Sequence, residues 1–186
     1  MKINFHNLGG LPDFVRVTRV LDEALGEVVF GWSGEALCLC CLGENALDAL
    51  RERADRWEVP VLCDGVGVSD KPSRAALKAF KINRPEAFPQ LLLIGSPFQQ
   101  KVWRQLIHIR SGETTCYSGI AHDIGVRCYR CVGTAVGQNP IALFVPCHRV
   151  IGRDGALCGF AYGIPLKEKL LAFEHSTKHR HGRRRG

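Results

Sequence analysis

The chain has 186 residues, of which 46% are hydrophobic and 23% are charged. This composition supplies a core for one medium domain or two small ones, and it excludes a chain that is disordered throughout. No uninterrupted apolar run reaches the ~18 residues of a membrane-spanning helix, and the N-terminus lacks the basic start and apolar stretch of an export signal. We therefore expect an intracellular protein without a membrane span, cytoplasmic or, in a eukaryote, nuclear.

The positive charge lies in the second half of the chain. Residues 1–94 contain 11 Lys and Arg against 13 Asp and Glu, whereas residues 95–186 contain 14 against 5, which gives the net charge of +7. A basic second half favours a nucleic-acid surface, although a solvated face with a charged tail has the same composition. The nine cysteines of an intracellular chain argue against a disulfide framework and for buried thiols, a metal site or a reactive sulfur.

The first half of the chain has the pattern of a mixed α/β domain. Two apolar runs, 28–32 and 36–42, are joined by a glycine-containing turn, which is typical of a β-hairpin. Asn45 is a candidate cap for an amphipathic helix over 46–57, because its apolar residues recur at helical spacing. A shorter helix is expected over 73–80.

The second half opens on a series of predicted helices. A capping box at Ser96 predicts a helix over 97–109. A short helix over 116–124, a turn at Gly125 and a third helix over 127–137 follow. Two short helices joined by a glycine-containing turn are typical of a helix-turn-helix, whose second helix meets DNA, although many three-helix bundles share this spacing.

A cysteine stands at the end of an apolar run. We predict a buried strand over 141–145 that delivers Cys147 between Pro146 and His148. Neighbouring positive charge and hydrogen bonds to sulfur would favour the thiolate. Adjacent side chains of an extended strand point to opposite faces, so His148 reaches Cys147 only if the chain turns at Pro146. The alternative is an ordinary core cysteine.

The segment 146–150, Pro-Cys-His-Arg-Val, resembles the active-site signature of the O6-alkylguanine-DNA alkyltransferases, also called methylated-DNA-protein-cysteine methyltransferases. The resemblance extends over residues 95–174 in several blocks that follow the order of the family. These blocks are Ser96 to Trp103, Gly112 to Thr114 with Tyr117, Arg130 with Val132, Asn139 with Pro140, the glycines Gly152, Gly155 and Gly159, and Lys167, Leu170, Leu171 and Glu174. Several ordered blocks are far more specific than one short motif.

The resemblance implies a single-turnover enzyme of DNA repair, which moves an alkyl group such as methyl from O6 of guanine, with O4 of thymine as a second substrate, to its own Cys147. A thiolate is the soft nucleophile that this displacement needs. By resemblance, His148 takes the thiol proton through a water, Glu174 orients His148, and Tyr117 contacts the base. No cofactor and no metal are implied.

The implied partner is double-stranded DNA that contains O6-alkylguanine, and the protein is expected to be a monomer. The target base must rotate out of the stack, and the resemblance assigns the filling of the gap to Arg130. The DNA-binding residues implied on or beside the recognition helix are Arg127, Tyr129, Arg130, Thr134 and Gln138. The implied structural and pocket residues are Asn139, Pro146, Val150, Cys158, Gly159 and Lys167.

The chain departs from the family pattern at two places. Only four residues separate Gly125 from Arg130 where the family has five, which shortens the turn before the recognition helix. Cys158 stands where serine is common, and a thiol is a weaker hydrogen-bond donor than a hydroxyl. We therefore expect Cys158 to reduce the activity or to alter the substrate range.

Two Cys-x-x-Cys pairs have the spacing of zinc ligands. Cys38 and Cys41 fall on an expected strand, where an odd spacing directs them to opposite faces. Cys128 and Cys131 flank Arg130, where a metal would obstruct the contact with DNA. We expect no metal at either pair.

The resemblance implies an α/β domain over 1–90, ribonuclease-H-like by analogy, and a mainly α, winged-helix-like domain with the helix-turn-helix over 91–174. A basic, disordered tail is expected over 175–186, with nonspecific attraction to phosphate as its alternative role. The main rival function is a non-catalytic lesion-binding protein of the same fold, against which Cys147 argues. A thiol-redox or zinc protein and a Cys-His hydrolase are further alternatives, the latter without a recognisable oxyanion-hole motif.

Overall fold

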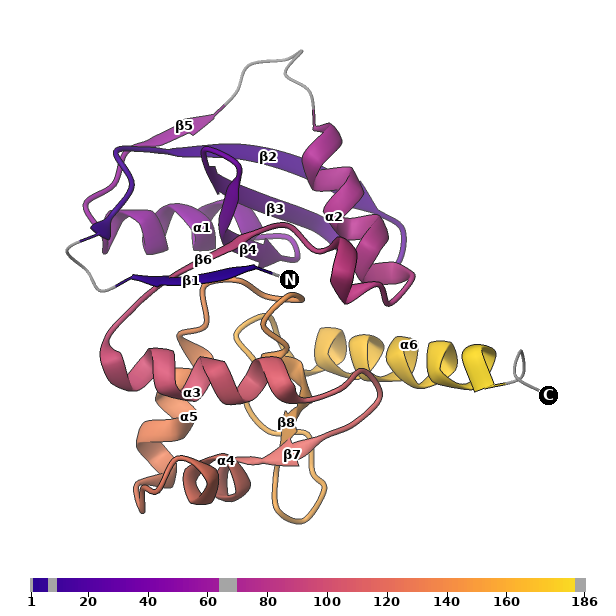
Figure 1. Ribbon diagram of the computed structural model, residues 1–186. Helices are drawn as coiled ribbons and strands as arrows, with labels where there is room; N and C mark the ends of the chain where they lie inside the picture. The colour runs from indigo at the N-terminus through magenta and orange to yellow at the C-terminus, as the bar shows by residue number, and fades with distance from the viewer. Residues whose placement is uncertain (1, 7–9, 64–69, 183–186) are drawn as a thin grey trace. The chain divides into compact units, whose positions relative to one another are not determined.

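The computed structural model describes residues 2–6, 10–63 and 70–182 (Figure 1). For residues 177–182 it describes the backbone alone. The chain divides into two compact units. The first contains residues 1–100 and 140–144, and the second contains residues 101–139 and 145–186. This division lies ten residues later than the boundary expected at residue 90, and the short segment 140–144 returns to the first unit.

The first unit is built on a six-stranded sheet with the strand order β1-β6-β4-β3-β2-β5. Three consecutive strands, β2, β3 and β4, pair antiparallel, whereas β5 pairs in parallel with β2, and β6 pairs in parallel with both β4 and β1 (Figure 1). The strands are β1 (Ile3–His6), β2 (Val15–Asp22), β3 (Gly26–Ser33), β4 (Ala36–Leu42), β5 (Val61–Cys63) and β6 (Leu91–Ile94).

The predicted hairpin is confirmed as β3 and β4. Its turn contains Gly34 at φ +56°, a conformation that favours glycine. In the middle of β3, a Cβ on Gly31 would lie 2.8 Å from Val15 Cγ1 and 2.9 Å from Leu39 Cβ, so only glycine fits between the neighbouring strands. Six of the seven residues of β4 are buried, which explains why this strand has a continuous apolar run rather than an alternating one.

Two helices accompany the sheet, close to their predicted positions. Helix α1 (Ala46–Asp55) ends two residues before the predicted end. Helix α2 (Lys71–Lys81) begins two residues before the predicted start and ends one residue after the predicted end. Asn45 occupies the cap position of α1, but its side chain makes no capping hydrogen bond. The helix therefore depends on its buried residues Ala46, Leu50 and Ala54 for its position.

The strand predicted over 141–145 is wrong. The segment pairs with β4 only through an isolated bridge between Cys40 and Ile141, and the chain then turns. Leu143 has φ +69°, which an extended strand does not allow. Phe144 nevertheless belongs to the core, where its ring packs against the rings of Phe30 and Phe88. The segment is apolar because it is buried, not because it is a strand.

The second unit contains most of the predicted helices and one two-stranded parallel ladder. Helix α3 begins at the end of the first unit, and the predicted capping box is formed there: Ser96 N donates to Gln99 Oε1 (2.7 Å), and Gln99 N donates to Ser96 Oγ (3.3 Å). The elements are α3 (Pro97–His108), β7 (Thr115–Cys116), α4 (Tyr117–Asp123), α5 (Tyr129–Gly137), β8 (Val150–Ile151) and α6 (Ile164–Gly182).

Side chains of α3 hold the following two helices by their backbone carbonyls. Lys101 Nζ donates to the carbonyl of Ile124 at the end of α4 (2.7 Å), and the buried Trp103 Nε1 donates to the carbonyl of Ala135 in α5 (2.8 Å). Gly125, in the turn between α4 and α5, has φ +70°, as predicted for a left-handed cap. Helix α5 begins at Tyr129, two residues later than predicted.

The expectation of a disordered tail from residue 175 differs from the structure, because α6 continues to Gly182. No proline or glycine interrupts the chain between Pro165 and Gly182, and basic residues near a helix C-terminus interact favourably with the helix dipole. Residues 183–186 lie outside the described residues. None of the helices in the described ranges has both the length and the apolar character needed to cross a lipid bilayer.

Candidate active site

Cys147 begins a single turn of 3₁₀ helix, Cys147–Arg149, that follows Pro146. The chain therefore turns at Pro146, which was the condition for His148 to lie on the same side as the sulfur. Cys147 is buried, with 7% of its surface exposed, and it lines a cavity of about 190 Å³. The cavity lining is completed by Tyr117, Gly133, Val136, Gly137, Asn139, Gly159, Phe160, Ala161 and Tyr162.

Asn139, directly after α5, holds the turn before the cysteine. Its Nδ2 donates to the carbonyl of Val145 (2.7 Å) and lies 3.1 Å from Cys147 Sγ, where it donates to the sulfur. Asn139 is itself 2% exposed, so these hydrogen bonds are protected from water. A buried amide donor aimed at sulfur favours the thiolate over the thiol.

His148 and Glu174 form a buried pair. His148 Nε2 donates to Glu174 Oε1 (2.9 Å), and the two side chains are 0% and 2% exposed. Complete burial lowers the pKa of His148, although the nearby carboxylate opposes this shift. Because the neutral ring carries its proton on Nε2, its Nδ1 is an acceptor, and no described residue donates to it.

Arg149 holds Glu174 from the other side, a role that the sequence analysis missed. Its Nε donates to Glu174 Oε2 (2.9 Å) and its Nη2 donates to Oε1 (2.6 Å), while the backbone N–H of Gly112 also donates to Oε2 (3.2 Å). Burial raises the pKa of Glu174, but the hydrogen bonds and the positive charge lower it to about 2. The hydrogen bond from His148 and those from Arg149, together with the positive charge of Arg149, thus keep Glu174 ionised.

The short parallel ladder brings the tyrosine to the cavity. Strand β7, which precedes Tyr117, pairs with β8, which follows the Cys147 turn, through Thr115 with Val150 and Cys116 with Ile151. Burial and the neighbouring Cys158 and Cys147 raise the pKa of Tyr117 to about 12. Its hydroxyl therefore remains protonated at neutral pH, and it donates a long hydrogen bond to the carbonyl of Cys158 (3.5 Å).

Lys167 on α6 fastens the loop that forms one wall of the cavity. Its ammonium donates to the carbonyls of Val150 (2.6 Å), Cys158 (2.7 Å) and Gly159 (3.3 Å). Gly159 has φ +40°, and its Cβ position would lie 3.8 Å from Tyr117 Oη. The lysine thus satisfies one carbonyl of β8 and two of the loop, and it fixes where Gly159 and Phe160 border the cavity.

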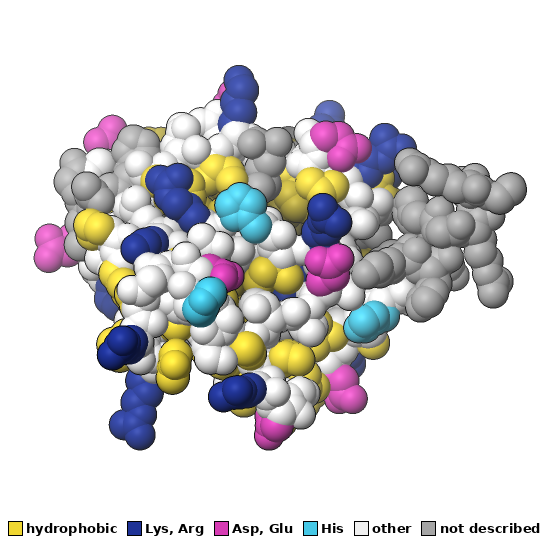
Figure 2. Space-filling model, turned by 60° about the horizontal axis from the view of Figure 1, so that its bottom comes forward, with side chains coloured by type: hydrophobic (Ala, Val, Ile, Leu, Met, Phe, Trp, Pro, Cys, Tyr) yellow, Lys and Arg dark blue, Asp and Glu magenta, His cyan; other side chains and the backbone are white. Residues whose placement is uncertain are grey.

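The residues assigned to DNA contact lie on α5 or beside it, and all are exposed: Arg127, Tyr129, Arg130, Thr134 and Gln138. Thr134 Oγ1 donates to the carbonyl of Arg130 (3.1 Å), one turn earlier in the same helix. Figure 2 shows basic, acidic and apolar side chains interspersed on one face of the molecule rather than a uniform basic patch. Binding to phosphate would therefore depend on individual side chains.

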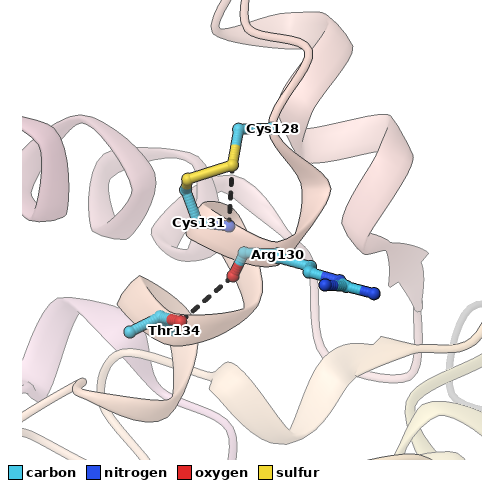
Figure 3. Close-up of a disulfide and its surroundings, with 4 residues drawn as sticks. All are labelled: Cys128, Arg130, Cys131 and Thr134. Carbon is cyan, nitrogen blue, oxygen red and sulfur yellow. Dashed lines mark hydrogen bonds between the residues drawn. A yellow bond between two sulfur atoms is a disulfide. The ribbon is translucent and has the colours of Figure 1, made fainter.

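The structure corrects the expectation that the cysteines are not joined by disulfides. Cys128 and Cys131 form a disulfide across the first turn of α5 (Figure 3). The helix places residues three apart on one side, at a Cα–Cα distance of 5.3 Å, which is within the range that a disulfide spans. Cys38 and Cys41 are buried in β4 and form no disulfide, and the described residues contain no cluster of His, Cys, Asp and Glu that could hold a metal ion.

The structure brings together residues that are far apart in the sequence. Cys147, Asn139 and Tyr117 share one cavity, and Glu174 reaches His148 from a helix 26 residues later. The cavity residues Gly133, Val136, Gly137 and Ala161 were not predicted; they have no polar group that would mark them in a sequence. Arg149 was visible within the segment 146–150, but its partner could not be derived from adjacency.

Comparisons with known proteins agree with this geometry. The family model described as 6-O-methylguanine DNA methyltransferase, DNA binding domain, matches residues 97–176. A methylated-DNA–protein-cysteine methyltransferase of Methanosarcina barkeri is 47% identical over 103 residues, which cover 54% of this chain and 65% of that protein. One of Debaryomyces hansenii is 45% identical over 87 residues, 46% of either chain. The matches to these two curated relatives thus span between about half and two thirds of their length.

A solved structure resembles nearly the whole chain. The crystal structure of Mycobacterium tuberculosis OGT in complex with DNA matches with a TM-score of 0.72 and 33% sequence identity, over 88% of this chain and 94% of that chain. This likeness includes both compact units, whereas the family model matches the second unit and only residues 97–100 and 140–144 of the first. The chain belongs to the family of the methylated-DNA–protein-cysteine methyltransferases.

Proposed function

We propose that the protein repairs DNA by transferring an alkyl group, such as methyl, from O6 of guanine to its own Cys147 in a single turnover. The observation that carries this proposal is the placement of the Cys147 sulfur at a cavity, where an amide donates to it. The next residue of the same turn, His148, forms a buried pair with Glu174 of α6. A non-catalytic lesion-binding protein would not need such a constellation.

The transfer is a displacement at the alkyl carbon. The Cys147 thiolate attacks this carbon, a C–S bond forms, and the bond from carbon to O6 breaks with its electron pair on the guanine. The thioether that results has no simple route back to a thiol, so each molecule would react once. The sulfur is the only group consumed, and no cofactor takes part.

His148 is the base that generates the thiolate. Its Nε2–H is committed to Glu174, so its Nδ1 lone pair is available for the thiol proton, which we infer to pass through a bridging water. The lowered pKa of His148 keeps the ring neutral and thus ready to accept. Glu174, fixed by Arg149, holds the tautomer and stabilises the imidazolium that forms.

Tyr117 and the pocket loop receive the base. The protonated Tyr117 hydroxyl can donate to the guanine ring as negative charge develops on it. Cys158 in the loop offers a weaker donor than serine toward the substrate oxygen, which would slow the reaction or change its substrate range. Asn139, Pro146 and Val150 keep the turn in place, and Lys167 keeps the loop with Gly159 in place.

The proposed substrate is a duplex, from which the alkylated guanine rotates into the cavity. The exposed first turn of α5, with Arg127, Tyr129 and Arg130, would enter the groove, and Arg130 would fill the gap. Thr134 and Gln138 lie further along the same exposed face and would contact the backbone. We infer that the protein acts as a monomer in the compartment that holds the DNA, and that O4-alkylthymine is a second substrate.

Two finer features of the fold belong to this proposal. In the first unit, three antiparallel strands are followed by a helix and by a strand parallel to the first of them, which supports a ribonuclease-H-like sheet. In the second unit, α4 and α5 with the glycine turn between them, and the ladder of β7, which precedes α4, with β8, which follows α5, support a winged-helix-like arrangement.

The test is the mass of the intact protein after incubation with a duplex that contains one O6-methylguanine. The wild-type chain is expected to gain one methyl group, mapped to Cys147, and Cys147→Ala is expected to gain none. Cys63→Ser removes an exposed thiol of the first unit and serves as the matched control, which should still be methylated. An unchanged wild-type mass with bound DNA would instead identify a lesion-binding protein.

A further inference from the structure

The disulfide at the start of α5 is not used by the transfer reaction. Cys128 and Cys131 are both exposed, and they enclose Tyr129 and Arg130 in a covalent ring (Figure 3). None of the other seven cysteines, all of which lie in the described ranges, takes part in a disulfide. This pair is therefore the place in the chain where a thiol reagent from solution meets two thiols that can join each other.

The helix end favours one of the two sulfurs as the reactive one. Cys128 is the cap residue of α5, and its Sγ accepts a hydrogen bond from the backbone N–H of Cys131 (3.2 Å). When the disulfide is open, this amide and the positive end of the helix would stabilise a thiolate at Cys128. The cap residue is thus the attacking sulfur, and Cys131 is the resolving one.

We propose that Cys128 and Cys131 are a reversible dithiol–disulfide site, which reacts with low-molecular-weight disulfides such as oxidised glutathione, and that the closed form engages duplex DNA more tightly than the open form. This inference rests on the proposed function of α5 as the DNA-contacting helix. It adds to that function a thiol-redox control of how strongly the helix binds.

The exchange balances without any further oxidant. The Cys128 thiolate attacks one sulfur of oxidised glutathione, the glutathione S–S bond breaks, and one reduced glutathione leaves. The Cys131 thiolate then attacks Cys128 Sγ in the mixed disulfide and releases the second glutathione. The two cysteines lose two electrons and two protons, and oxidised glutathione gains both. Excess reduced glutathione reverses both steps.

Closing the ring changes the surface that meets DNA in two ways. It orders the backbone of Tyr129 and Arg130 before binding, so that less conformational entropy is lost in the complex. It also removes the negative thiolate at Cys128, which in the open form would repel phosphate beside Arg130. The Arg130 side chain extends away from the disulfide, so the closed ring leaves its guanidinium uncovered (Figure 3).

The control is expected to act on DNA engagement and not on the chemistry at sulfur. Cys147 is buried, and its partners Asn139, His148 and Glu174 lie on other segments than the first turn of α5. A substrate that needs no DNA contact, the free base O6-benzylguanine, should therefore react at the same rate in both redox states. A duplex substrate should distinguish them.

The experiment equilibrates the full chain in buffers with different ratios of reduced to oxidised glutathione and maps the Cys128–Cys131 bond by mass spectrometry. Duplex affinity is measured by fluorescence anisotropy in a Cys147→Ala background, and transfer rates are measured with Cys147 present. The closed form should bind the duplex roughly five- to thirtyfold more tightly, which corresponds to the ordering of about one residue. The rate with O6-benzylguanine should stay constant.

The double variant Cys128→Ser, Cys131→Ser, which can neither close the ring nor form a thiolate, should show a single duplex affinity at every glutathione ratio, weaker than that of the closed form, and Cys116→Ser should respond like the wild type. The inference would be overturned by equal duplex affinity in both redox states, or by a Cys128–Cys131 pair that stays open at every glutathione ratio. It would also be overturned if the duplex affinity of the double variant still changed with the glutathione ratio. Equal transfer from duplex in both states would also overturn the inference while leaving the proposed function intact. Absence of transfer in both states would overturn the proposed function itself.

Discussion

The two units of the molecule bury different kinds of polar side chain. Among the described residues, the buried polar side chains of the first unit are neutral: Thr18, Ser73 and Gln100. Those of the second unit are Asn139, His148, Lys167 and Glu174, three of which are ionisable. Burial of an ionisable group costs several kcal/mol unless it is paired, so the stability of the second unit depends on the pairing of these three groups.

The two units also differ in how the hydrogen-bonding groups of these buried side chains are paired. In the first unit, Trp32 Nε1 donates to Ser73 Oγ (2.9 Å), and Thr18 Oγ1 completes a closed neutral set with the same hydroxyl. In the second, Glu174 accepts from three different residues, while His148 Nδ1 lacks a donor or acceptor among the described residues. An open acceptor beside a saturated carboxylate is expected of a proton-transfer site, not of a structural one.

The largest expected effect that tests this contrast is that of Glu174→Gln. The amide keeps the shape but removes the charge, which leaves Arg149 without its counter-ion and His148 without its tautomer partner. We expect the transfer rate to fall roughly 10²- to 10³-fold, and the free energy of unfolding to fall by about 3 kcal/mol. Quench-flow assays measure the transfer rate, and urea unfolding measures the free energy of unfolding.

The exposed Glu168→Gln on the same helix is the matched control for the lost charge, and both quantities should remain close to wild type. If Glu174→Gln lost stability but kept its transfer rate, the buried carboxylate would be a structural feature, and the difference between the two units would carry no information on catalysis.

The same pair predicts a loss of stability in acid that the neutral set of the first unit does not produce. The pKa of Glu174 falls from 4.5 to about 2 on folding, so its contribution is complete above pH 4.5 and is lost as the pH falls toward 2. At about 1.4 kcal/mol per pKa unit, this contribution is on the order of 3 kcal/mol.

Burial lowers the pKa of His148 below 6.5, so protonation of the unfolded chain removes further stability as the pH falls below that value. Urea unfolding between pH 7 and pH 2.5 should show both losses. Glu174→Gln should lack the step below pH 4.5, and an unchanged step in that variant would assign it to other carboxylates.

Sequence patterns predicted those parts of the fold in which the local signal agrees with the final environment. The hairpin, α1, α2 and the capped start of α3 were predicted because turn residues and periodicity determine them locally. Strands β1 and β6 were not predicted, because each has only four residues, too few to show a periodicity, and they pair with segments more than 50 residues away in the sequence. The apolar run 141–145 was mistaken for a strand for the same reason.

The candidate site divides in a similar way. The resemblance named Cys147, His148 and Glu174 because each belongs to a family block, and the structure places the three in one turn and one helix face. The bidentate contact of Arg149 depends on the orientation of α6, which no local pattern specifies. The disulfide of Cys128 and Cys131 depends on the start of α5 at Tyr129, two residues later than the predicted start, which places both sulfurs at the cap.

A smaller effect is expected from Arg130→Ala, which tests the exposed helix of the second unit rather than its buried groups. Because Arg130 is exposed, the free energy of unfolding should stay within about 0.5 kcal/mol of wild type. Transfer from a duplex should slow roughly 10- to 100-fold, since the arginine offsets part of the cost of unstacking. Transfer from free O6-benzylguanine should be unchanged.

Arg56→Ala, which removes an exposed charge from α1 in the first unit, controls for the change in net charge. Equal slowing of duplex and free-base reactions by Arg130→Ala would show that the arginine supports the cavity instead of the DNA.

The smallest expected effect returns to the first unit. Ser73→Ala leaves the buried indole N–H of Trp32 without its acceptor and Thr18 without its partner, which should lower the free energy of unfolding by about 1–2 kcal/mol. The transfer rate per folded molecule should not change, because the set is neutral and belongs to the unit that does not contain Cys147, His148 and Glu174. Urea unfolding and active-site titration with O6-benzylguanine separate the two quantities. A slower reaction in Ser73→Ala would mean that the sheet unit also contributes to catalysis, and the distinction between a structural and a catalytic unit would then fail.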